Sequence, residues 1–443
     1  MDSREQQDRR EARRKKRLRS QIMVYTVFLL VILALGTGIG YGVYALMENR
    51  KASEEKEQDN QELIEEMLAT EENLPSIEPT PDPTPEPTPE VVEPTREERL
   101  DAYVDERIAQ MPLEDKVAGL FVVRPEAITG VGTAVQAGDG TRQALEANPV
   151  GGLIYFDQNI QSEAQLKEML ENTARYAKYP LFLAVDEEGG TVSRIGSSIG
   201  PKTDSAGAIG ETGNPENAYQ AGAAMGTALY GLGFNVDFAP VADLANVEGS
   251  IMEGRAYGSD VSVVSSFVNA MVRGLQEQKV SACLKHFPGM GSATEDTHDG
   301  KVSTDRTAEQ FWAEELAVFQ AGINEGADMV MVSHMAASAL TGDNEPSIFS
   351  RTLVTGILRE QMGFQGVIIT DALDMGAISQ YYAADEASIM AVLAGCDMLL
   401  MPEDYEKAYT GVLEAVRSGN IDEERINDSL RRIYRIKYAD MVQ

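Results

Sequence analysis

Two of the chain's three histidines lie in one short segment, residues 285–300, beside a lysine and an aspartate. The apolar run 280–284 before it predicts a short buried strand, and the polar, glycine-bearing run after it predicts a loop. The strand would deliver Lys285 and His286 to its carboxyl end, while the loop carries Asp296 and His298, two positions apart. Because a nearby aspartate can orient an imidazole ring and shift its pKa, this pair could transfer protons.

Other polar side chains follow other apolar runs, at positions where predicted strands end or in the segments just beyond. They are Asp186, Arg194, Asp243, Arg255, His334 and Asp371. In a parallel barrel the carboxyl ends of the strands and the loops after them build the active site. All three histidines fall at such positions, so we expect these side chains to share one site rather than to serve as separate structural residues.

A carboxylate and a proton-transfer group around a polar substrate held by Lys and Arg suit glycoside hydrolysis. The dispersed histidines give little support for a metal site, and we expect none, because no H-x-H or H-E-x-x-H pattern occurs. No glycine-rich nucleotide fingerprint follows a strand and opens a helix, and no cofactor is expected. The run 196–200 matches G-x-S-x-G, but Pro201 follows at once, which predicts a loop rather than a nucleophile elbow.

The elements that must position these residues alternate between apolar runs and amphipathic segments. The eight predicted strands are 119–123, 151–156, 181–185, 234–238, 282–286, 329–333, 366–370 and 397–401. The predicted helices are 97–111, 163–176, 218–232, 262–278, 308–321, 353–362, 388–394 and 406–418. Continuous apolar strands alternating with helices indicate a parallel sheet, and eight of them favour the α/β class as a single (β/α)8 TIM-type barrel.

Composition restricts the possible partners. The formal net charge of −33 argues against a nucleic-acid binder, which needs a basic face. The two cysteines, Cys283 and Cys396, lie in or beside apolar runs, so we expect buried free thiols and no disulfide framework.

The N-terminal region predicts a membrane anchor. Residues 1–21 are basic, with nine Lys or Arg against four Asp or Glu in the first twenty positions. Residues 22–47 then run for 26 positions without a charge, which is long enough to span a bilayer. A cleaved signal peptide is the alternative, but the run is long for that role and no small-residue cleavage site follows. The basic flank predicts a cytoplasmic N-terminus in a single-pass protein of the cell membrane, with the remainder extracellular.

A linker of two parts follows at 48–96. Its first part is charged, and residues 75–94 contain eight prolines, which favour an extended polyproline II stalk of roughly 60 Å. A docking peptide for a proline-recognition module is the alternative reading. Residues 97–443 show no break in composition and are predicted to form one catalytic barrel domain.

Five motifs in this order resemble glycoside hydrolase family 3, and more narrowly its β-N-acetylglucosaminidase (β-N-acetylhexosaminidase) subgroup. They are AVDEEGG at 184–190 with Arg194, NVDFAPVAD at 235–243, RAYG at 255–258, KHFPGMG with DTH between 285 and 298, and GVIITDALDM at 366–375. The resemblance covers about residues 97–443. It implies retention of configuration, no metal and a terminal β-linked N-acetylglucosamine substrate, often from peptidoglycan fragments.

The resemblance also implies roles for particular residues. Asp371 would be the nucleophile and His298 the general acid/base, with Asp296 holding its tautomer. The residues implied to bind the sugar are Asp186, Arg194, Arg255, Lys285 and His286. Asp374 is a competing nucleophile, but Asp371 follows the strand directly, where its side chain is held in place.

Two positions depart from the family pattern. Met290 stands where the family commonly has histidine, and Thr191 stands where arginine is frequent. These departures bear on loop rigidity and affinity more than on the class of reaction.

The sequence supports three hypotheses of function. The first is an anchored exo-β-N-acetylglucosaminidase that acts on cell-wall or related glycans. The second is a phosphorylase, because a histidine acid does not repel an incoming phosphate as a carboxylate would. The third is a non-catalytic glycan-binding wall protein, which would have no need of a nucleophile and an acid together.

Overall fold

In the computed structural model of the protein, residues 94–298 and 300–442 are described, and residues Val92–Gln443 belong to one compact unit. Across these described ranges, no helix is both long enough and apolar enough to cross a membrane. The predicted tail at 1–21, the span at 22–47 and almost all of the linker at 48–96 lie outside the described residues, whereas the predicted barrel domain lies almost wholly within them.

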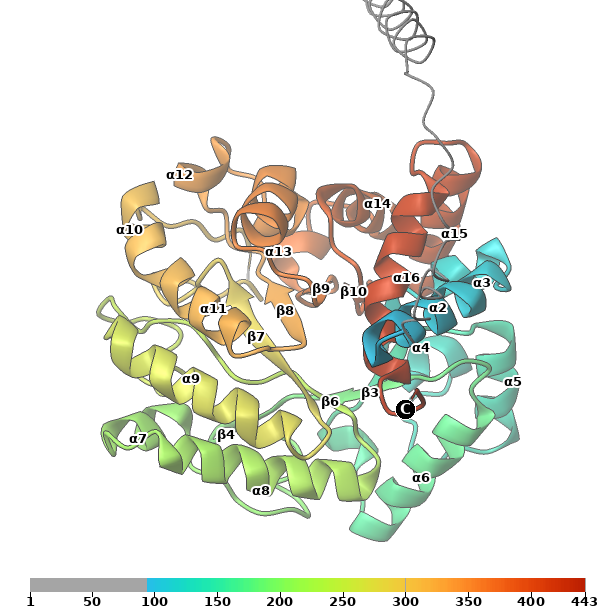
Figure 1. The fold of residues 1–443 in the computed structure, drawn as a ribbon, viewed down its shortest axis with the longest axis horizontal. Helices are drawn as coiled ribbons and strands as arrows, with labels where there is room; N and C mark the ends of the chain where they lie inside the picture. Colours follow the sequence, from blue (N-terminus) through green and yellow to red (C-terminus); the bar gives the residue numbers. More distant parts are fainter. Residues whose placement is uncertain (1–93, 299, 443) are drawn as a thin grey trace, which may run out of the picture. The chain divides into compact units, whose positions relative to one another are not determined.

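Eight parallel strands form the centre of this unit (Figure 1). They are β1 (Phe121–Val123), β2 (Gly152–Ile154), β3 (Phe182–Val185), β6 (Val236–Asp237), β7 (Ser281–Phe287), β8 (Met329–Val332), β9 (Val367–Thr370) and β10 (Leu399–Leu400). Their order is β10-β1-β2-β3-β6-β7-β8-β9, and a parallel bridge from Ile369 to Met398 joins β9 to β10. The sheet therefore closes on itself, as the (β/α)8 prediction requires, and each strand overlaps its predicted range.

Helices surround this barrel, and the eight predicted helical segments are all helical over most of their lengths. The α-helices are α2 (Arg96–Ala109), α3 (Leu113–Ala118), α4 (Pro125–Thr129), α5 (Asp139–Ala147), α6 (Glu163–Tyr176), α7 (Ala206–Glu211), α8 (Glu216–Leu232), α9 (Val261–Gln276), α10 (Ala308–Ala313), α11 (Glu315–Asn324), α12 (Ser338–Thr341), α13 (Gly376–Ser379), α14 (Ala384–Ala394), α15 (Tyr405–Arg417) and α16 (Glu423–Tyr438). The remaining helical segments are η1 (Asp157–Asn159), η2 (Ser347–Phe349) and the π-helix η3 (Thr352–Gln361).

Local chemistry explains where several of these helices begin. Three helices begin with a capping box, at Thr95, Ser162 and Thr307. The side chain of each cap residue accepts a hydrogen bond from the backbone amide three residues later, and the side chain of that later residue accepts one from the amide of the cap residue. Such capping boxes satisfy amide groups that have no partner within the helix. The predicted helix 308–321 is interrupted at Glu314, whose φ of −123° and ψ of −81° are not helical, so α10 and α11 are separate.

Several elements were not predicted from the sequence, among them the short helices α3, α4, α5, α7, α12 and α13. A small antiparallel hairpin, β4 (Glu187–Gly189) with β5 (Val192–Ser193), follows β3 and lies outside the barrel sheet. Helix α16 packs against α2, and the ion pairs Arg431–Asp105 and Arg435–Asp101, both 2.8 Å, join them. The first and last helices of the described unit therefore lie side by side.

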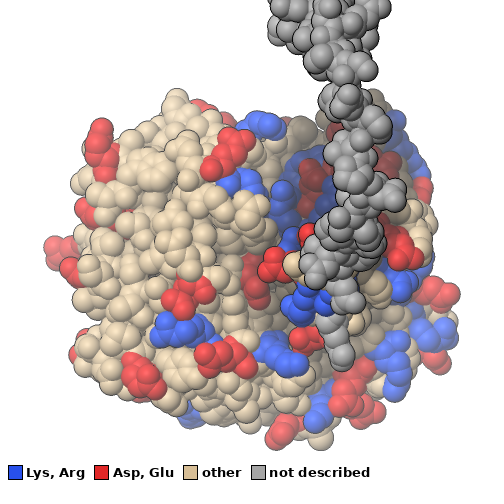
Figure 2. Space-filling model, viewed as in Figure 1, with Lys and Arg blue, Asp and Glu red and all other residues tan. Residues whose placement is uncertain are grey.

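The core lies within the barrel and between the barrel and its helices, where the strand residues are buried. Cys283 and Cys396 are both buried free thiols, as predicted. On the face shown in Figure 2, Lys and Arg are interspersed with Asp and Glu, and no continuous basic stripe crosses the described residues there.

Candidate active site

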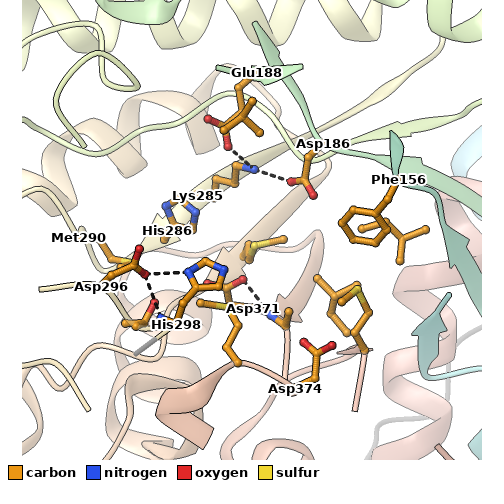
Figure 3. A pocket seen from close by; sticks show the side chains of 18 of the residues that line it. Phe156, Asp186, Glu188, Lys285, His286, Met290, Asp296, His298, Asp371 and Asp374 are labelled. Carbon is orange, nitrogen blue, oxygen red and sulfur yellow. Dashed lines mark hydrogen bonds and ion pairs between the residues drawn. The ribbon is translucent and has the colours of Figure 1, made fainter. Parts of the chain in front are cut away.

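A cavity of about 610 Å³ opens at the carboxyl end of the barrel strands. This volume is within the range of small-molecule sites. The structure brings all eight residues to which the resemblance assigned roles into its lining: Asp186, Arg194, Arg255, Lys285, His286, Asp296, His298 and Asp371. Figure 3 shows Asp186, Lys285, His286, Asp296, His298 and Asp371 around this cavity. Polar residues from the ends of four strands and the loops after them, those of β3, β6, β7 and β9, thus converge on one site.

Strand β7 presents two consecutive side chains to this cavity. Successive residues of a regular strand point to opposite faces, so Lys285 and His286 could not both face the same cavity in an unbroken strand. The register between β7 and β8 shifts between Leu284 and Phe287, which is the position of this pair. Such an irregularity changes the direction in which a side chain points, and Lys285 and His286 both line the cavity.

Lys285 lies at the centre of a buried ionic network. Its Nζ is 2.7 Å from Asp186 Oδ1 and 2.7 Å from Glu188 Oε1. Arg255 donates to both carboxylate oxygens of Glu188, at 2.9 and 2.7 Å, in a bidentate pair. The lysine and Glu188 side chains are only 3% and 4% exposed. These groups hold one another in place before any substrate binds.

The charges in this network shift one another's pKa values. Burial alone would raise the pKa of Glu188, but Lys285 and Arg255 outweigh burial and lower it to about 2. Burial alone would lower the pKa of Lys285, yet Asp186 and Glu188 raise it above its ordinary value. Both residues are therefore charged at neutral pH.

Asp243 fixes His286 and the start of the following loop. Its Oδ2 lies 2.8 Å from His286 Nδ1, and its Oδ1 accepts the amide hydrogen of Met290 at 2.6 Å. Met290 is 3% exposed and lines the cavity. Although Met290 replaces a histidine that is common in the family, its backbone amide still holds the loop to Asp243. Thr191 is exposed in the turn between β4 and β5.

Asp371 follows β9 directly, and its amide donates to Val332 O at 2.9 Å. Its Oδ1 accepts the Ala372 amide hydrogen at 2.8 Å, and the side chain lines the cavity. Burial by itself would raise the pKa of Asp371, but His334, His286, the Ala372 amide and Lys285 together hold it below its ordinary value. Asp371 is therefore a carboxylate at neutral pH.

His334 supports the backbone beside Asp371. Its Nε2 lies 2.8 Å from Ala372 O, and a donor is needed there because a carbonyl only accepts. Burial lowers the pKa of His334 although Asp371 opposes the shift, so the ring is neutral. Within the described part of the chain its Nδ1 has no partner, which fits an unprotonated nitrogen.

Asp296 and His298 form a hydrogen-bonded pair on the loop. His298 Nδ1 lies 2.7 Å from Asp296 Oδ1, and the His298 amide donates to the same oxygen at 2.9 Å. Partial burial would raise the pKa of Asp296, but these two bonds lower it. The His298 side chain is 70% exposed, so the pair lies at the open side of the cavity.

The backbone around this pair packs on the loop after β9. Ala377 donates to Thr297 O at 2.9 Å, and a Cβ added at Gly376 would lie 2.3 Å from His298 O. The loop's start is equally tight, since a Cβ at Gly291 would lie 1.5 Å from Leu244 O. Glycine at these positions permits close backbone contact. The Asp296–His298 pair and Asp371 are thus joined through neighbouring backbone segments.

The wall on the β1–β2 side carries a further ionic group. Two arginines lie near the ring of Phe156, with the Arg124 and Arg194 guanidinium carbons 5.6 and 5.7 Å from its centroid. Arg194 pairs with Asp157 at 3.2 Å, and Arg124 pairs with Asp374. Asp374, the competing nucleophile in the sequence analysis, is therefore paired with an arginine. Asp371, in contrast, is not part of an ion pair among the described residues.

Sequence reasoning assigned no role to several residues that shape this site. Glu188, Asp243 and His334 lie at or just after predicted strand ends, and this position indicates that they belong near the site. Their partners lie far away along the chain, so the sequence did not indicate what each of them contacts. Arg124 and Phe156 follow the first and second strands and were not singled out. In the described ranges, no cluster of three or more His, Cys, Asp or Glu residues could hold a metal ion.

The family comparison agrees with this architecture. Residues 104–436 match the model of the glycosyl hydrolase family 3 N terminal domain, which is more than half of the chain. The chain belongs to glycosyl hydrolase family 3. The family assignment confirms the resemblance that the five motifs indicated.

Similar proteins are named β-hexosaminidases. A β-hexosaminidase A from Pseudoalteromonas piscicida is 30% identical over 317 residues, which cover 65% of this chain and 53% of the relative. A β-hexosaminidase from Xanthomonas campestris is 36% identical over 268 residues, covering 59% and 79%. The chain thus spans about half the length of the first relative.

A solved structure shows the same fold. A family 3 β-N-acetylglucosaminidase from Paenibacillus sp. str. FPU-7 is 34% identical and superposes with a TM-score of 0.69, covering 75% of this chain and 63% of that chain. The barrel described above is therefore the fold of a family 3 enzyme.

Proposed function

We propose that the protein is a retaining exo-β-N-acetylglucosaminidase that removes non-reducing terminal β-linked N-acetylglucosamine from cell-wall or related glycans by double displacement. The observation that carries this proposal is that a carboxylate, Asp371, and the Asp296–His298 pair line one cavity. The names of the family 3 relatives, β-hexosaminidase and β-N-acetylglucosaminidase, support the choice of sugar.

In the first step the Asp371 carboxylate attacks the anomeric carbon, and the glycosidic C–O bond breaks. His298, protonated at Nε2, donates that proton to the departing oxygen, so the aglycone leaves as an alcohol. Asp296 accepts from Nδ1 and stabilises the imidazolium. This pairing fixes the tautomer that directs Nε2 towards the substrate.

In the second step a water molecule attacks the anomeric carbon of the glycosyl ester on Asp371, and its oxygen forms the new bond to that carbon. His298, now neutral, takes one proton from that water, the ester bond breaks, and the Asp371 carboxylate is regenerated. Two inversions leave the released sugar with the configuration of the substrate. The exposure of His298 to the open side of the cavity gives water and aglycone access to the same face.

The buried network on β3 and β7 is proposed to hold the sugar. Asp186 and Lys285 offer an acceptor and a donor to vicinal hydroxyl groups, and His286 offers its Nε2 because Asp243 occupies Nδ1. Arg255 and Arg194 complete the wall. Ion pairs that hold these side chains before binding reduce the entropy lost when the sugar binds.

We also propose a single-pass membrane anchor at 22–47, a cytoplasmic tail at 1–21 and an extracellular linker at 48–96. The uncharged run of 26 residues after a basic flank supports the anchor and its orientation. The proline-rich linker would place the barrel outside the membrane, near a cell-wall polymer.

The full chain in detergent should hydrolyse 4-nitrophenyl N-acetyl-β-glucosaminide, and NMR should detect the β-anomer of the sugar first. Asp371→Asn should lower kcat by about 10³-fold or more with an unchanged unfolding transition, because the nucleophile is removed. Glu360→Gln, an exposed change on η3, is the control. Initial release of the α-anomer would contradict retention.

The same assay separates the other hypotheses. Acceleration by inorganic phosphate, with formation of sugar 1-phosphate, would identify a phosphorylase. Binding of N-acetylglucosamine oligosaccharides without turnover at any pH from about 4 to 8 would identify a binding protein.

A further inference from the structure

Part of the cavity wall has no role in the proposed chemistry. Arg124 follows β1 and occupies the N-cap position of α4, while Asp374 lies in the loop after β9. Their side chains, 41% and 25% exposed, form an ion pair at the cavity surface. Phe156, from the end of β2, lies beneath the arginine. Three separate loops therefore build this wall.

The position of the catalytic groups indicates what this wall contacts. Figure 3 shows Asp371 between the Lys285–Asp186–Glu188 network and Asp374. A terminal sugar whose anomeric carbon faces Asp371, and whose hydroxyl groups reach the Lys285 network, directs its glycosidic bond away from that network. The leaving oxygen lies at His298, its proposed proton donor, and the loop after β9 that carries Asp374 packs on the His298 segment through the Ala377 N to Thr297 O bond of 2.9 Å. Arg124 and Asp374 line the same cavity, so they are the wall that the group beyond the bond would meet.

The chemistry of the pair suits a polyhydroxylated ring. An arginine offers five N–H donors and a carboxylate offers only acceptors, so the two together match adjacent hydroxyl groups. Their charges cancel, which gives no net attraction for an ionic group. Burial raises the pKa of Asp374 although Arg124 opposes this shift. The neighbouring Phe156 face adds an apolar surface of the kind that ligand sites combine with polar groups.

We propose that Arg124 and Asp374 form the aglycone subsite and hydrogen-bond the hydroxyl groups of the sugar residue on the reducing side of the cleaved bond. This inference rests on the proposed glycosidase function. It assigns Asp374 to substrate selection instead of nucleophilic attack. It also implies that the cavity favours an oligosaccharide over a glycoside whose aglycone is not a sugar.

The test compares two substrates, N,N′-diacetylchitobiose and 4-nitrophenyl N-acetyl-β-glucosaminide, with the full-length protein. Arg124→Met should lower kcat/KM for the disaccharide about tenfold or more beyond any loss on the aryl glycoside, because only the disaccharide supplies hydroxyl groups to the subsite. Asp374→Asn, which keeps the side-chain shape, should act in the same direction. Arg142→Met is the matched control, since Arg142 is 46% exposed and pairs with Asp139 on α5, and it should leave the ratio unchanged.

Equal losses on both substrates would show that the pair only supports the loop, and they would overturn the proposal. An unchanged ratio in both variants would overturn it too. Failure of the unmodified protein to cleave either substrate would instead refute the glycosidase function, and the subsite with it.

Discussion

Replacing Glu188 with glutamine should destabilise the barrel in a pH-dependent way. Glu188 is nearly inaccessible and makes a bidentate pair with Arg255 and an ion pair with Lys285. Its pKa is lowered from 4.5 to about 2. A difference of this size corresponds to about 3 kcal/mol of interaction with the charged form. The raised pKa of Lys285 reflects the same contacts and is not added.

The sign of the pH dependence follows from linkage. Between pH 2 and 4.5 the unfolded chain binds a proton at Glu188 that the folded chain does not, so stability rises with pH through this window. The contribution is complete above pH 4.5, is about 2 kcal/mol at pH 3.5, and disappears below about pH 2. Glu188→Gln should therefore lose about 3 kcal/mol at pH 7 and about 2 kcal/mol at pH 3.5, so the loss shrinks as the pH falls.

The measurement is urea unfolding of the unmodified protein and the variant at several pH values between 3.5 and 7, followed by far-UV circular dichroism. Glu360→Gln, at an exposed position on η3, is the control and should track the unmodified protein. Two results would refute the reasoning. One is equal stability of Glu188→Gln and the unmodified protein at pH 7, and the other is a loss that does not change with pH.

Three further changes follow from the site and the core. Asp296→Asn should lower kcat about 100-fold for substrates with poor leaving groups and much less for a dinitrophenyl glycoside, which needs no proton; equal losses would argue against proton transfer by His298. Gly376→Ala should lower kcat by up to about 10²-fold with little change in unfolding, since its Cβ would meet His298 O at 2.3 Å; full activity would show that the loop's position is unimportant. Asp397→Ala should cost about 3–5 kcal/mol in urea unfolding at pH 7, because it leaves Arg359, Arg425 and Arg432 without their shared buried partner; a loss under 1 kcal/mol would count against that network.

The arrangement of the barrel was accessible from sequence because buried parallel strands read as continuous apolar runs. The run 366–370 predicted β9 and placed Asp371 at its end, where the structure has it. Helix α16 was missed although Ile426, Leu430 and Ile433 have helical spacing and are buried. The helical pattern of apolar residues is present in the sequence. No strand follows this helix, however, so it does not belong to a strand–helix repeat of the barrel.

The ionic connections of the site were not accessible in the same way. Glu188 and Arg255 are 67 positions apart, and Arg124 and Asp374 are 250 apart. Charged side chains at strand ends indicate that a site exists, but their pairing depends on loop conformations such as the β4–β5 hairpin. The shift in register that lets Lys285 and His286 face one cavity also has no local sequence signal.

The most direct test of the proposed mechanism is to trap the glycosyl intermediate with a fluorinated N-acetylglucosaminyl fluoride and map the labelled peptide by mass spectrometry. Double displacement by Asp371 predicts one sugar attached to that residue, and no labelling of Asp371→Asn. Attachment to Asp374, or turnover of the reagent with no covalent adduct at any time, would contradict the assignment.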